Sequence, residues 1–432
     1  MTGEPVAPGT GPSSIVFLNR FYWPDIAATG QMLTDLAEDL AARGWRVTVV
    51  ASQTSYDGRP AKLPAEEWHQ GVRIIRVKSS SHTRHRKIGR LVDYVTYLVG
   101  ATARLLWLDP PRAVVAMSDP PFSVAIALVV GRLRGAKVVY WVQDLFPDIA
   151  AALDVMSSRS LLYRVVRRLA AWMHFRCDAV IALGPQMVRA LVAAGAHPER
   201  TTFVHNWADL SGVRPIPPAE NAFIRAHRLD GRFVVLYSGN AGRAHAFGAV
   251  LHAARALRAE SDVLFLFIGG GQRIPSLKQQ CEQAGLTNVQ FLDYQPRAEL
   301  ASSLSSASVS LVTEDPSVVG MLVPSKTYGI LASGRPLLFV GAARSDVARV
   351  VREADCGIVI EHEDGEGLVQ AIRRLRDDAS LRRRLGENAR QAAEERFGRS
   401  KGTRDWERAM LDCLNDPSRE PRGQRSAPSR PS

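Results

Sequence analysis

The sequence of 432 residues is short of cysteine, of long apolar runs and of metal-binding patterns. Its cysteines are far apart and form no CxxC pair, which argues against a zinc site and favours a reducing compartment; they are Cys177, Cys281, Cys356 and Cys413. No stretch reaches the ~18 consecutive apolar residues of a transmembrane helix, and residues 1–13 lack the pattern of a signal peptide. These absences predict a cytoplasmic, soluble or peripheral protein without a metal.

Positive charge is what the sequence has in excess. Lys and Arg number 55 against 43 Asp and Glu, for a net charge of +12 and a pI near 9.9. Such a balance favours an anionic partner, whether nucleic acid, acidic lipid or a phosphorylated small molecule. An arginine-rich composition without any such partner would account for part of the same excess.

Two basic segments lie beside apolar residues at helical spacing. The first, ahead of a helix, is Arg73, Arg76, Lys78, Arg84, Arg86, Lys87 and Arg90, and the second is Arg159, Arg164, Arg167, Arg168 and Arg176. Basic amphipathic helices are typical of membrane surfaces, although outer helices of an ordinary α/β domain show the same pattern. The sequence therefore suggests an inner-membrane surface as one partner.

Strand and helix patterns alternate along the chain in two blocks. Short apolar runs predict strands at 14–19, 46–51, 113–117, 137–141, 179–182 and 202–205, then at 233–237, 263–268, 289–292, 309–312, 336–340 and 358–360. This alternation predicts an α/β protein with two Rossmann-like lobes, whose parallel sheets face each other across a cleft. The expected boundaries are a disordered tail at 1–13, a first lobe at 14–210, a linker at 211–222, a second lobe at 223–400, a closing helix at 401–415 and a disordered tail at 416–432.

Ligands of parallel sheets bind beyond the carboxyl ends of the strands, so the segments that follow strands are the candidate site. In the first lobe, Thr29 is expected to cap a helix and Gly30 to open its amino end to an anion. Asp144 follows another strand and suits hydroxyl recognition or acid–base work, whereas Asp148 is expected to cap the next helix. For the segment with Thr29 and Gly30, a capped loop that binds no ligand is an equally good interpretation.

In the second lobe, glycines and cations follow the strands. Gly239 and Arg243 lie in a loop that would cradle phosphate, although its spacing is neither that of a P-loop nor that of GxGxxG. After the next strand, Gly269-Gly270-Gly271 followed by Arg273 shows the same combination of glycines and a cation. Lys326 stands at the start of a helix, where the helix dipole disfavours a cation unless an anion compensates it. A glycine turn with surface cations is the simpler alternative, and the lysine favours an anion site.

The ordered segments WVQDLFPDIA, HNWAD, YSGNAGRAHAF, FIGGGQR and VPSKTYGILASGRP give the sequence a family likeness across residues 14–400. The chain resembles the family 4 glycosyltransferases of GT-B fold, most closely the branch with proposed N-acetyl-L-fucosamine transferases of bacterial O-antigen assembly. The resemblance implies a retaining transfer from a nucleotide-diphosphate sugar to a glycan or lipid-linked acceptor. It implies no cofactor beyond that co-substrate and no nucleic acid, and it places the acceptor on the first lobe, at the membrane.

The resemblance also assigns roles to residues. Arg243 and Lys326 would neutralise the diphosphate leaving group, and Asp144 would lie near the sugar hydroxyls. Donor binding would involve Gly30, Gly239, Asn240, His245, Gly269, Gly270, Gly271, Arg273, Gly320, Met321, Leu322 and Ser325, with Gly320 and Met321 offering backbone N–H groups.

The sequence departs from the family pattern at its acids. The two glutamates that the family usually carries eight positions apart fall on Met321 and Gly329, and its usual Arg and Lys fall on Asn240 and His245. Glu314 or Asp315 would be the available substitutes. This departure leaves open a catalytically silent partner subunit that binds nucleotide-sugar, besides a nucleotide-sugar epimerase on the same fold. A nucleic-acid-binding protein is suggested by the pI alone and lacks a motif.

Overall fold

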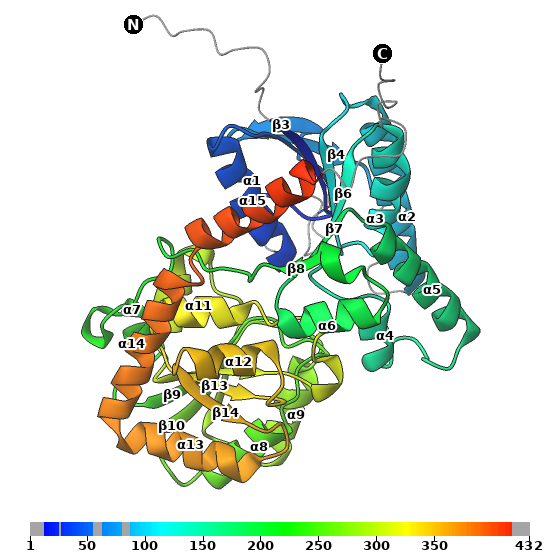
Figure 1. The fold of residues 1–432 in the computed structure, drawn as a ribbon. Coiled ribbons are helices and arrows are strands. Elements are labelled where there is room, and N and C mark those ends of the chain that lie inside the picture. Colours follow the sequence, from blue (N-terminus) through cyan, green and yellow to red (C-terminus); the bar gives the residue numbers. More distant parts are fainter. Residues whose placement is uncertain (1–12, 26, 55–62, 80–86, 417–432) are drawn as a thin grey trace, which may run out of the picture.

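The structure is a computed structural model that describes residues 13–25, 27–54, 63–79 and 87–416. Figure 1 shows two lobes, each a sheet flanked by helices, with the first half of the chain in one lobe and most of the second half in the other. The predicted α/β class with two parallel, Rossmann-like sheets is confirmed.

The first sheet has the strand order β3-β4-β2-β1-β5-β6-β7-β8 and is parallel apart from the β3–β4 pair. Its strands are β1 (Ser14–Leu18), β2 (Arg46–Ser52), β3 (Glu66–His69), β4 (Val72–Val77), β5 (Ala113–Met117), β6 (Lys137–Trp141), β7 (Ala179–Ala182) and β8 (Thr201–Phe203). The flanking helices are α1 (Ala28–Ala42), α2 (Lys87–Trp107), α3 (Ser123–Ile126), which continues as the π-helical turn η1 (Ala127–Gly131), α4 (Asp148–Ala152), α5 (Leu161–Arg176), α6 (Pro185–Ala193) and η2 (Pro198–Arg200).

The second sheet is parallel throughout, in the order β11-β10-β9-β12-β13-β14. Its strands are β9 (Phe233–Ser238), β10 (Val263–Ile268), β11 (Val289–Leu292), β12 (Val309–Thr313), β13 (Leu337–Val340) and β14 (Gly357–Ile360). The helices are η3 (Pro218–Glu220), α7 (Ala222–Ala226), α8 (Gly248–Ala256), α9 (Ile274–Gln283), η4 (Arg297–Glu299), α10 (Leu300–Ser305), η5 (Pro316–Val318), α11 (Lys326–Ala332), α12 (Asp346–Glu353), α13 (Gly365–Asp377), α14 (Ala379–Glu395) and α15 (Arg399–Asn415).

The first basic segment has acidic neighbours because part of it lies in a β-hairpin, which the sequence alone did not predict. Strand β3 pairs with β4 and brings two glutamates beside its arginines, so that Arg73 Nε lies 2.7 Å from Glu66 and the buried Arg76 pairs with Glu67. The interpretation of Arg76 as a surface cation is therefore wrong. Arg84 and Arg86 lie outside the described residues, as do the side chains of Lys87 and Arg90.

Two expected caps are also absent. Helix α1 starts at Ala28, with Ala27 at its N-cap and no side-chain cap, so Thr29 lies inside the first turn. Helix α4 begins at Asp148 without a side-chain cap; the Asp148 carboxylate instead accepts hydrogen bonds from Tyr163 (3.1 Å) and Arg167 (3.2 Å) of α5. Asp148 thus ties α4 to α5.

The lobes contact each other directly through α6 of the first and α12 of the second (Figure 1). The Asp346 carboxylate, at the start of α12, accepts hydrogen bonds from the backbone N–H groups of Gln186 (3.1 Å) and Met187 (3.3 Å) in the first turn of α6. A carboxylate at a helix amino end is favoured by the helix dipole. One apolar core runs on from the first lobe into the second around this contact.

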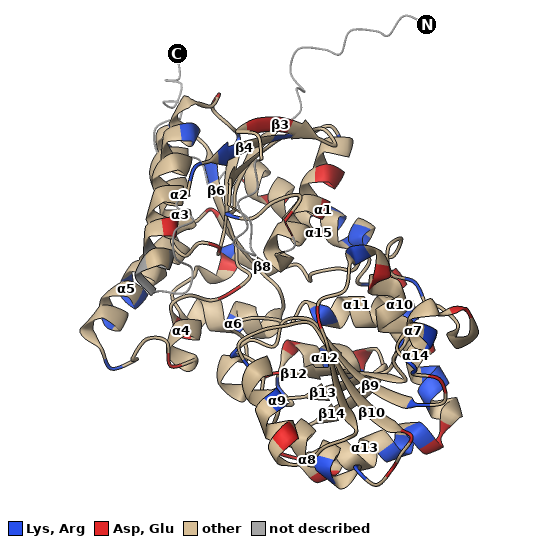
Figure 2. Cartoon of the chain, turned by 180° about the vertical axis from the view of Figure 1, so that it is seen from behind, with Lys and Arg blue, Asp and Glu red and all other residues tan. Residues whose placement is uncertain are grey.

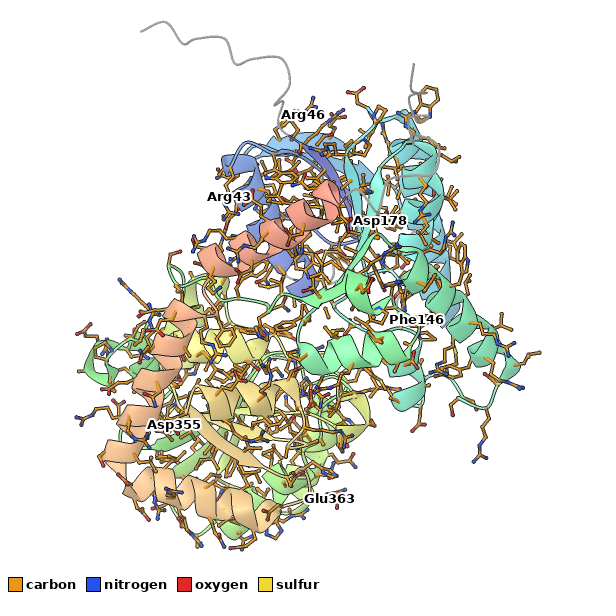
Figure 3. All side chains as sticks on the ribbon, in the orientation of Figure 1. Arg43, Arg46, Phe146, Asp178, Asp355 and Glu363 are labelled. Atoms are coloured by element: carbon orange, nitrogen blue, oxygen red, sulfur yellow. The ribbon has the colours of Figure 1, made fainter. Side chains whose placement is uncertain are left out.

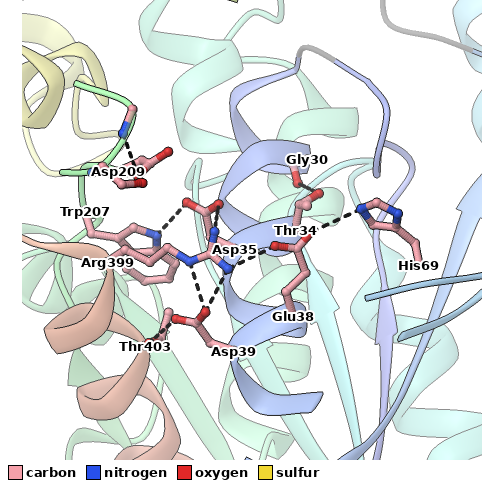
Figure 4. A network of polar contacts seen from close by, with 12 residues as sticks. Gly30, Thr34, Asp35, Glu38, Asp39, His69, Trp207, Asp209, Arg399 and Thr403 are labelled. Atoms are coloured by element: carbon pink, nitrogen blue, oxygen red, sulfur yellow. Dashed lines mark hydrogen bonds and ion pairs between the residues drawn. The ribbon is translucent and has the colours of Figure 1, made fainter. Parts of the chain in front are cut away.

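The last helix, α15, returns to the first lobe and lies beside α1 (Figure 1). Its anchor is Arg399, whose guanidinium donates to Asp35 (2.9 Å), Glu38 (3.0 Å) and Asp39 (2.7 Å) of α1, as Figure 4 shows. The Trp207 indole N–H also donates to Asp35 (3.1 Å).

In the described part of the chain, no helix has the combined length and hydropathy needed to cross a bilayer.

Candidate active site

The two lobes meet at a short backbone pairing between residues expected in the site. Asp144, which follows β6, forms an isolated antiparallel bridge with Leu322, and the Leu145 N–H donates to the Met321 carbonyl (2.7 Å). The next residue, Phe146, packs edge-on against Phe122, with ring centroids 5.5 Å apart, and Figure 3 shows it on the first-lobe side of the junction. The structure therefore brings Asp144 against residues 320–322, although Gly320 comes 176 positions after Asp144 in the sequence.

The loop at residues 320–322 is less open than expected. Gly320 has a φ of 79°, and a Cβ there would lie 3.1 Å from the Gln186 carbonyl oxygen and 3.3 Å from the Ala190 Cβ, both in α6. The Met321 N–H donates to the Val318 carbonyl (2.9 Å). In this conformation the Met321 N–H holds the turn, and its role as a backbone donor to a ligand stays a prediction.

Lys326 is the first residue of α11 and reaches back over the end of β9. Its half-buried ammonium donates to the Tyr237 hydroxyl, to the Asn240 carbonyl (3.4 Å) and to His245 Nε2 (3.4 Å), and it lies 3.9 Å from the centre of the Tyr237 ring. None of these partners carries negative charge. Burial lowers the pKa of Lys326 to about 7, because the charged form loses water without gaining an anion.

His245 sets the direction of the hydrogen bond that it shares with Lys326. Its Nδ1 lies 2.6 Å from the Thr313 carbonyl oxygen, which only accepts, so Nδ1 carries the proton. Nε2 is then the acceptor that faces the Lys326 ammonium. Burial, reinforced by Lys326, lowers the pKa of His245 to about 3, so this histidine is neutral at physiological pH.

The glycines after β9 and β10 let two loops cross at backbone distance. Gly239, Gly269 and Gly271 have φ values of 124–125°, which L side chains rarely adopt. A Cβ on Gly269 would lie 2.4 Å from the Gly239 carbonyl oxygen, and one on Gly271 would lie 2.5 Å from the Ala241 carbonyl oxygen. The close approach anticipated from the three glycines is thus made by protein backbone. At Gly270, a Cβ would lie 3.0 Å from the Tyr294 ring.

Arg243 is exposed and bridges the two lobes. Its Nε donates to Gln272 Oε1 (2.9 Å), and its Nη1 donates to the carbonyl of Leu153, just after α4 (3.5 Å). The neighbouring Arg273 is exposed, and its N–H donates to the Ala241 carbonyl (2.9 Å). Arg243 therefore stands in the same crossed-loop region as Asn240, the residue whose carbonyl accepts from Lys326.

Asp144 is exposed at the surface, although surrounding protein atoms remove part of the water around its carboxyl group. Desolvation, followed by the neighbouring carboxylate of Asp119, raises the pKa of Asp144 to about 6. Its backbone N–H and that of Gln143 both donate to Ser118 Oγ (3.1 Å each), which fixes the turn after β6. An acid whose pKa lies near neutrality, held on a rigid turn, suits exchange of hydrogen bonds or protons with a hydroxyl.

The remaining candidates differ in how near they come to Lys326. Ser325 is the N-cap of α11, with no side-chain cap bond, whereas Gly30 is buried in the first turn of α1 with the Phe21 carbonyl 3.2 Å from where its Cβ would be. The group that approaches Gly30 is thus the loop after β1. Gly239 is close, since its Cβ would lie 3.6 Å from Lys326 Cε.

The two suggested substitute acids lie just after β12 and face different surroundings. Asp315 is held locally, accepting from the Ser317 N–H (2.9 Å) and hydroxyl (2.6 Å). Glu314 is 1% exposed, and its Oε2 has no hydrogen-bond partner among the described residues. Burial raises the pKa of Glu314 to about 7. Glu314 directly follows Thr313, the partner of His245, so it is the better placed of the two.

Tyr237 and Asp346 are contacts that the sequence did not single out. Tyr237 is a buried strand residue whose hydroxyl donates to the Asn240 carbonyl (3.1 Å) and accepts from Lys326. Its position at the end of β9, directly before Ser238-Gly239, was the sequence signal that could have identified it.

Among the described residues, no three His, Cys, Asp or Glu side chains cluster in a way that could hold a metal ion.

Two family descriptions match the chain, one on each lobe. "Glycosyl transferase 4-like domain" matches residues 28–207, and "Glycosyl transferases group 1" matches residues 220–392. Together they cover both sheets and the crossed loops. The chain belongs to the family 4 glycosyltransferases.

Two curated relatives of this glycosyltransferase are bacterial. A probable glycosyltransferase, WbjE of Pseudomonas aeruginosa, is 29% identical over 238 residues, 55% of this chain and 59% of its own length. The putative colanic acid biosynthesis glycosyl transferase WcaI of Escherichia coli is 23% identical over 91% of this chain and 97% of its own. The WbjE match thus spans little more than half of that relative.

Solved structures share the fold over nearly the whole chain. Sucrose-phosphate synthase from Thermosynechococcus elongatus superposes with a TM-score of 0.73 at 18% identity, covering 93% of this chain and 98% of its own. HepE of Anabaena in complex with UDP-glucose gives 0.71 at 15% identity, covering 92% and 99%. WaaG, a glycosyltransferase of lipopolysaccharide biosynthesis, gives 0.65 at 18% identity, covering 93% and 99%. The expected GT-B architecture is confirmed.

Proposed function

We propose that this glycosyltransferase moves a sugar, with retention, from a nucleotide-diphosphate sugar to a glycan or lipid-linked acceptor. The pathway would be the biosynthesis of a bacterial cell-surface glycan of O-antigen type, on the inner face of the cytoplasmic membrane. Support for the pathway comes from the relatives, whose names include colanic acid and lipopolysaccharide core biosynthesis. Support for the donor comes from HepE, a neighbour in fold that binds UDP-glucose.

The observation that carries the proposal is Lys326. It is a half-buried cation with three neutral partners, at a helix start where the dipole also opposes it. A diphosphate would supply the missing negative charge and would be bound by the same ammonium. The neutral His245 then acts by positioning Lys326 while adding no charge of its own.

The chemistry follows from where negative charge develops. As the glycosidic phosphate bond breaks, charge builds up on the oxygens of the departing nucleoside diphosphate, and fixed cations and N–H groups stabilise it. We assign that role to Lys326 and Arg243, without a metal or other cofactor. Asp144, beside the crossed loops of the second lobe, would hold a hydroxyl of the sugar or of the acceptor.

The test is a panel of nucleoside diphosphates and nucleotide-sugars, including UDP-glucose and UDP- and GDP-linked N-acetylated and deoxy sugars, read by thermal shift. Ligand that binds only the native state raises the melting temperature, so the true donor should stand out. Turnover is then measured with the best donor, with and without EDTA. EDTA should leave turnover unchanged if no metal takes part.

The outcomes separate the alternatives. Release of nucleoside diphosphate with transfer to an acceptor supports the proposal. Binding without turnover over a range of acceptors would show the silent partner subunit, which the lack of an acid at Met321 and Gly329 favours as the second candidate. Conversion of the sugar while it stays on the nucleotide would show the epimerase.

A further inference from the structure

Helix α5 packs on the protein with one side and presents an apolar stripe on the opposite side. Its buried residues are Ala170, Met173 and His174. At 3.6 residues per turn, Leu161, Val165 and Trp172 point away from these residues, whereas Leu162 and Leu169 lie on the flank nearer Met173. All five are exposed by 47–70%. An outer helix usually has apolar residues facing the core and polar residues facing solvent. Helix α5 differs because it also exposes apolar residues to solvent.

Helix α2 has the same arrangement. Tyr97, Ala101 and Leu105 are fully buried and line its packed side. Val92, Val95 and Val99 follow one another at three- and four-residue spacing on the opposite side and are exposed by 45–65%. Trp107, at the end of α2, is 89% exposed.

The two helices lie along the same side of the first lobe, as both Figure 1 and Figure 2 show. Between them lies η1, which contacts α2 and exposes Val129 and, just beyond its end, Leu133. The Arg132 guanidinium donates to the Arg176 carbonyl at the end of α5. We call the exposed sides of α2, η1 with residues 132–134, and α5 the apolar–basic face. Most of the exposed large apolar side chains in the described chain belong to it.

Cations border the apolar stripes, and acids are scarce. Arg104, Arg132, Arg164, Arg168 and Arg176 are exposed on these segments. The single acid within α2, η1 and α5 is Asp93, which is 1% exposed and lies 3.4 Å from Arg20. Blue arginine segments on α5 are visible in Figure 2. A partner for this face must therefore accept apolar side chains and carry negative charge.

A second copy of the chain fits this requirement poorly. In a two-fold dimer the same patch meets itself, so the arginines of one face would oppose those of the other. Large apolar patches on soluble proteins mark interaction sites. Exposed tryptophans beside arginines on amphipathic helices match the boundary between lipid headgroups and acyl chains.

We propose that the apolar–basic face binds the surface of an anionic phospholipid bilayer. Trp172, Leu161, Leu169 and Val99 enter the headgroup boundary, while Arg164 and Arg168 contact lipid phosphates. Each such arginine is worth roughly fivefold in partitioning.

The face is continuous with the candidate active site. Helix α4 ends beside Leu153, whose carbonyl accepts from Arg243, and Asp148 of α4 pairs with Arg167 of α5 (3.2 Å). The chain between Asp144 and Leu161 thus joins the site to the bilayer-binding helix. This part of the inference rests on the proposed function: a lipid-linked acceptor would arrive on the side where α5 leads to Arg243.

The experiment is cosedimentation of the full chain with vesicles of phosphatidylcholine alone or mixed with phosphatidylglycerol. The apolar variant carries Leu161→Gln, Leu169→Gln and Trp172→Gln, and the charge variant carries Arg164→Glu and Arg168→Glu. Matched controls on the other faces are Leu300→Gln with Leu411→Gln, and Arg383→Glu with Arg408→Glu, since these four side chains are also exposed.

We expect binding to the anionic vesicles only, weakened at least tenfold in both variants and less than twofold in both controls. Binding of the charge variant should also depend less on salt than that of the wild type. Absence of binding to anionic vesicles, equal binding of the variants and the wild type, or equal binding to both lipids overturns the proposal. A dimer in sedimentation velocity that the apolar variant abolishes would show a second copy as the occupant.

This test and that of the proposed function fail separately. Vesicle binding is measured without nucleotide, so it holds or fails whatever the donor is. Each variant is also tested for thermal stabilisation by UDP-glucose, or by whichever member of the panel stabilises the wild type. Unchanged stabilisation with lost vesicle binding assigns the loss to the face. If no nucleotide-sugar stabilises any form, the proposed function fails while the bilayer result stands, and unchanged melting temperatures then verify the folding of the variants.

Discussion

The arginine-rich helices of the two lobes use the same residue type in opposite ways. On α13, Arg373 and Arg376 both pair with Glu260, and on α14, Arg384 pairs with Asp355, which Figure 3 marks on the second lobe. On α5, Arg164 and Arg168 lie on a helix with no acidic residue. Apolar residues follow the same division, since Leu385 of α14 is 3% exposed and Leu169 of α5 is 47% exposed. Acidic partners thus balance several arginines on the second lobe, whereas Arg164 and Arg168 stand on a face of the first lobe whose helices carry few acids.

Under the two proposals, stabilisation of the leaving group belongs to the second lobe and membrane docking to the first. Within the second lobe, Lys326 stands apart from the paired arginines because its partners are neutral. Changes at Lys326, at the junction of the lobes and on α5 should therefore affect different measurements.

The largest effect is expected for Lys326→Ala. Losing one preorganised cation at a developing charge costs roughly two to three orders of magnitude in turnover. The measurement is initial rate at saturating donor, with Lys278→Ala of α9 as the control for loss of a lysine on this lobe. Near-normal transfer by Lys326→Ala would remove the basis for assigning the chemistry to this residue.

Next in size is Arg399→Ala, which tests how firmly α15 joins the lobes. Asp35 is 8% exposed at its side chain and would lose its cation, and removing one partner of a half-buried pair should lower the free energy of unfolding by about 2 kcal/mol. Urea unfolding followed by tryptophan fluorescence measures it, since Trp207 lies in the network. The exposed Arg404→Ala on the same helix is the control. A loss below ~0.5 kcal/mol would mean that α15 is held mainly by its apolar side.

A pH effect of intermediate size follows from the lowered pKa of Lys326. The free lysine titrates at about 7 and a bound diphosphate raises its pKa, so binding takes up a proton above pH 7 and none well below it. Affinity for UDP-glucose should be level below pH 6 and fall by up to ~10-fold per unit as the pH rises beyond 7. Calorimetry in two buffers of different ionisation enthalpy measures the proton uptake. Lys326→Arg should bind without this dependence, and a dependence unchanged in that variant would point to another group.

The smallest effect is expected for Leu169→Ala in the absence of membranes. A side chain that is exposed in the folded chain contributes little to folding, so the free energy of unfolding should change by less than ~0.5 kcal/mol. The matched change Leu385→Ala on α14 should cost about 2–4 kcal/mol, because it leaves a cavity in a packed core. Equal losses at the two positions would show that the apolar stripe of α5 is packed in solution and would break the contrast between the helices.

Much of the fold could be predicted from the alternation of apolar runs. Strands β5, β6, β7 and β10 lie where the pattern predicts them, because parallel strands buried on both faces are nearly continuous apolar segments. Strand β11 also lies where it was predicted, although it is a half-buried edge strand. The hairpin β3–β4 could not be predicted in this way, because Arg73 and Arg76 interrupt the apolar pattern. Their glutamate partners come from the paired strand, and a single sequence does not show which strands pair.

The candidate site could be predicted in part. Lys326 was found because a lysine at a helix start conflicts with the dipole, a conflict that can be seen in the local sequence. The glycine loops were found for a similar reason, although their close neighbours are each other's backbone. The assigned roles of Arg243, Asp144 and the donor-binding residues stay predictions.

The sequence by itself determined the two-lobed α/β architecture, the glycine loops after the strands and the placement of a cation at the start of α11, since each follows from local residue patterns along the chain. Only the tertiary structure decided that Lys326 meets Tyr237 and His245 instead of an acid, that Asp144 pairs with Leu322, and that the stripes of α2 and α5 share one side. Those facts depend on distances between residues far apart in the chain, which are set when the sheets form and the lobes pack.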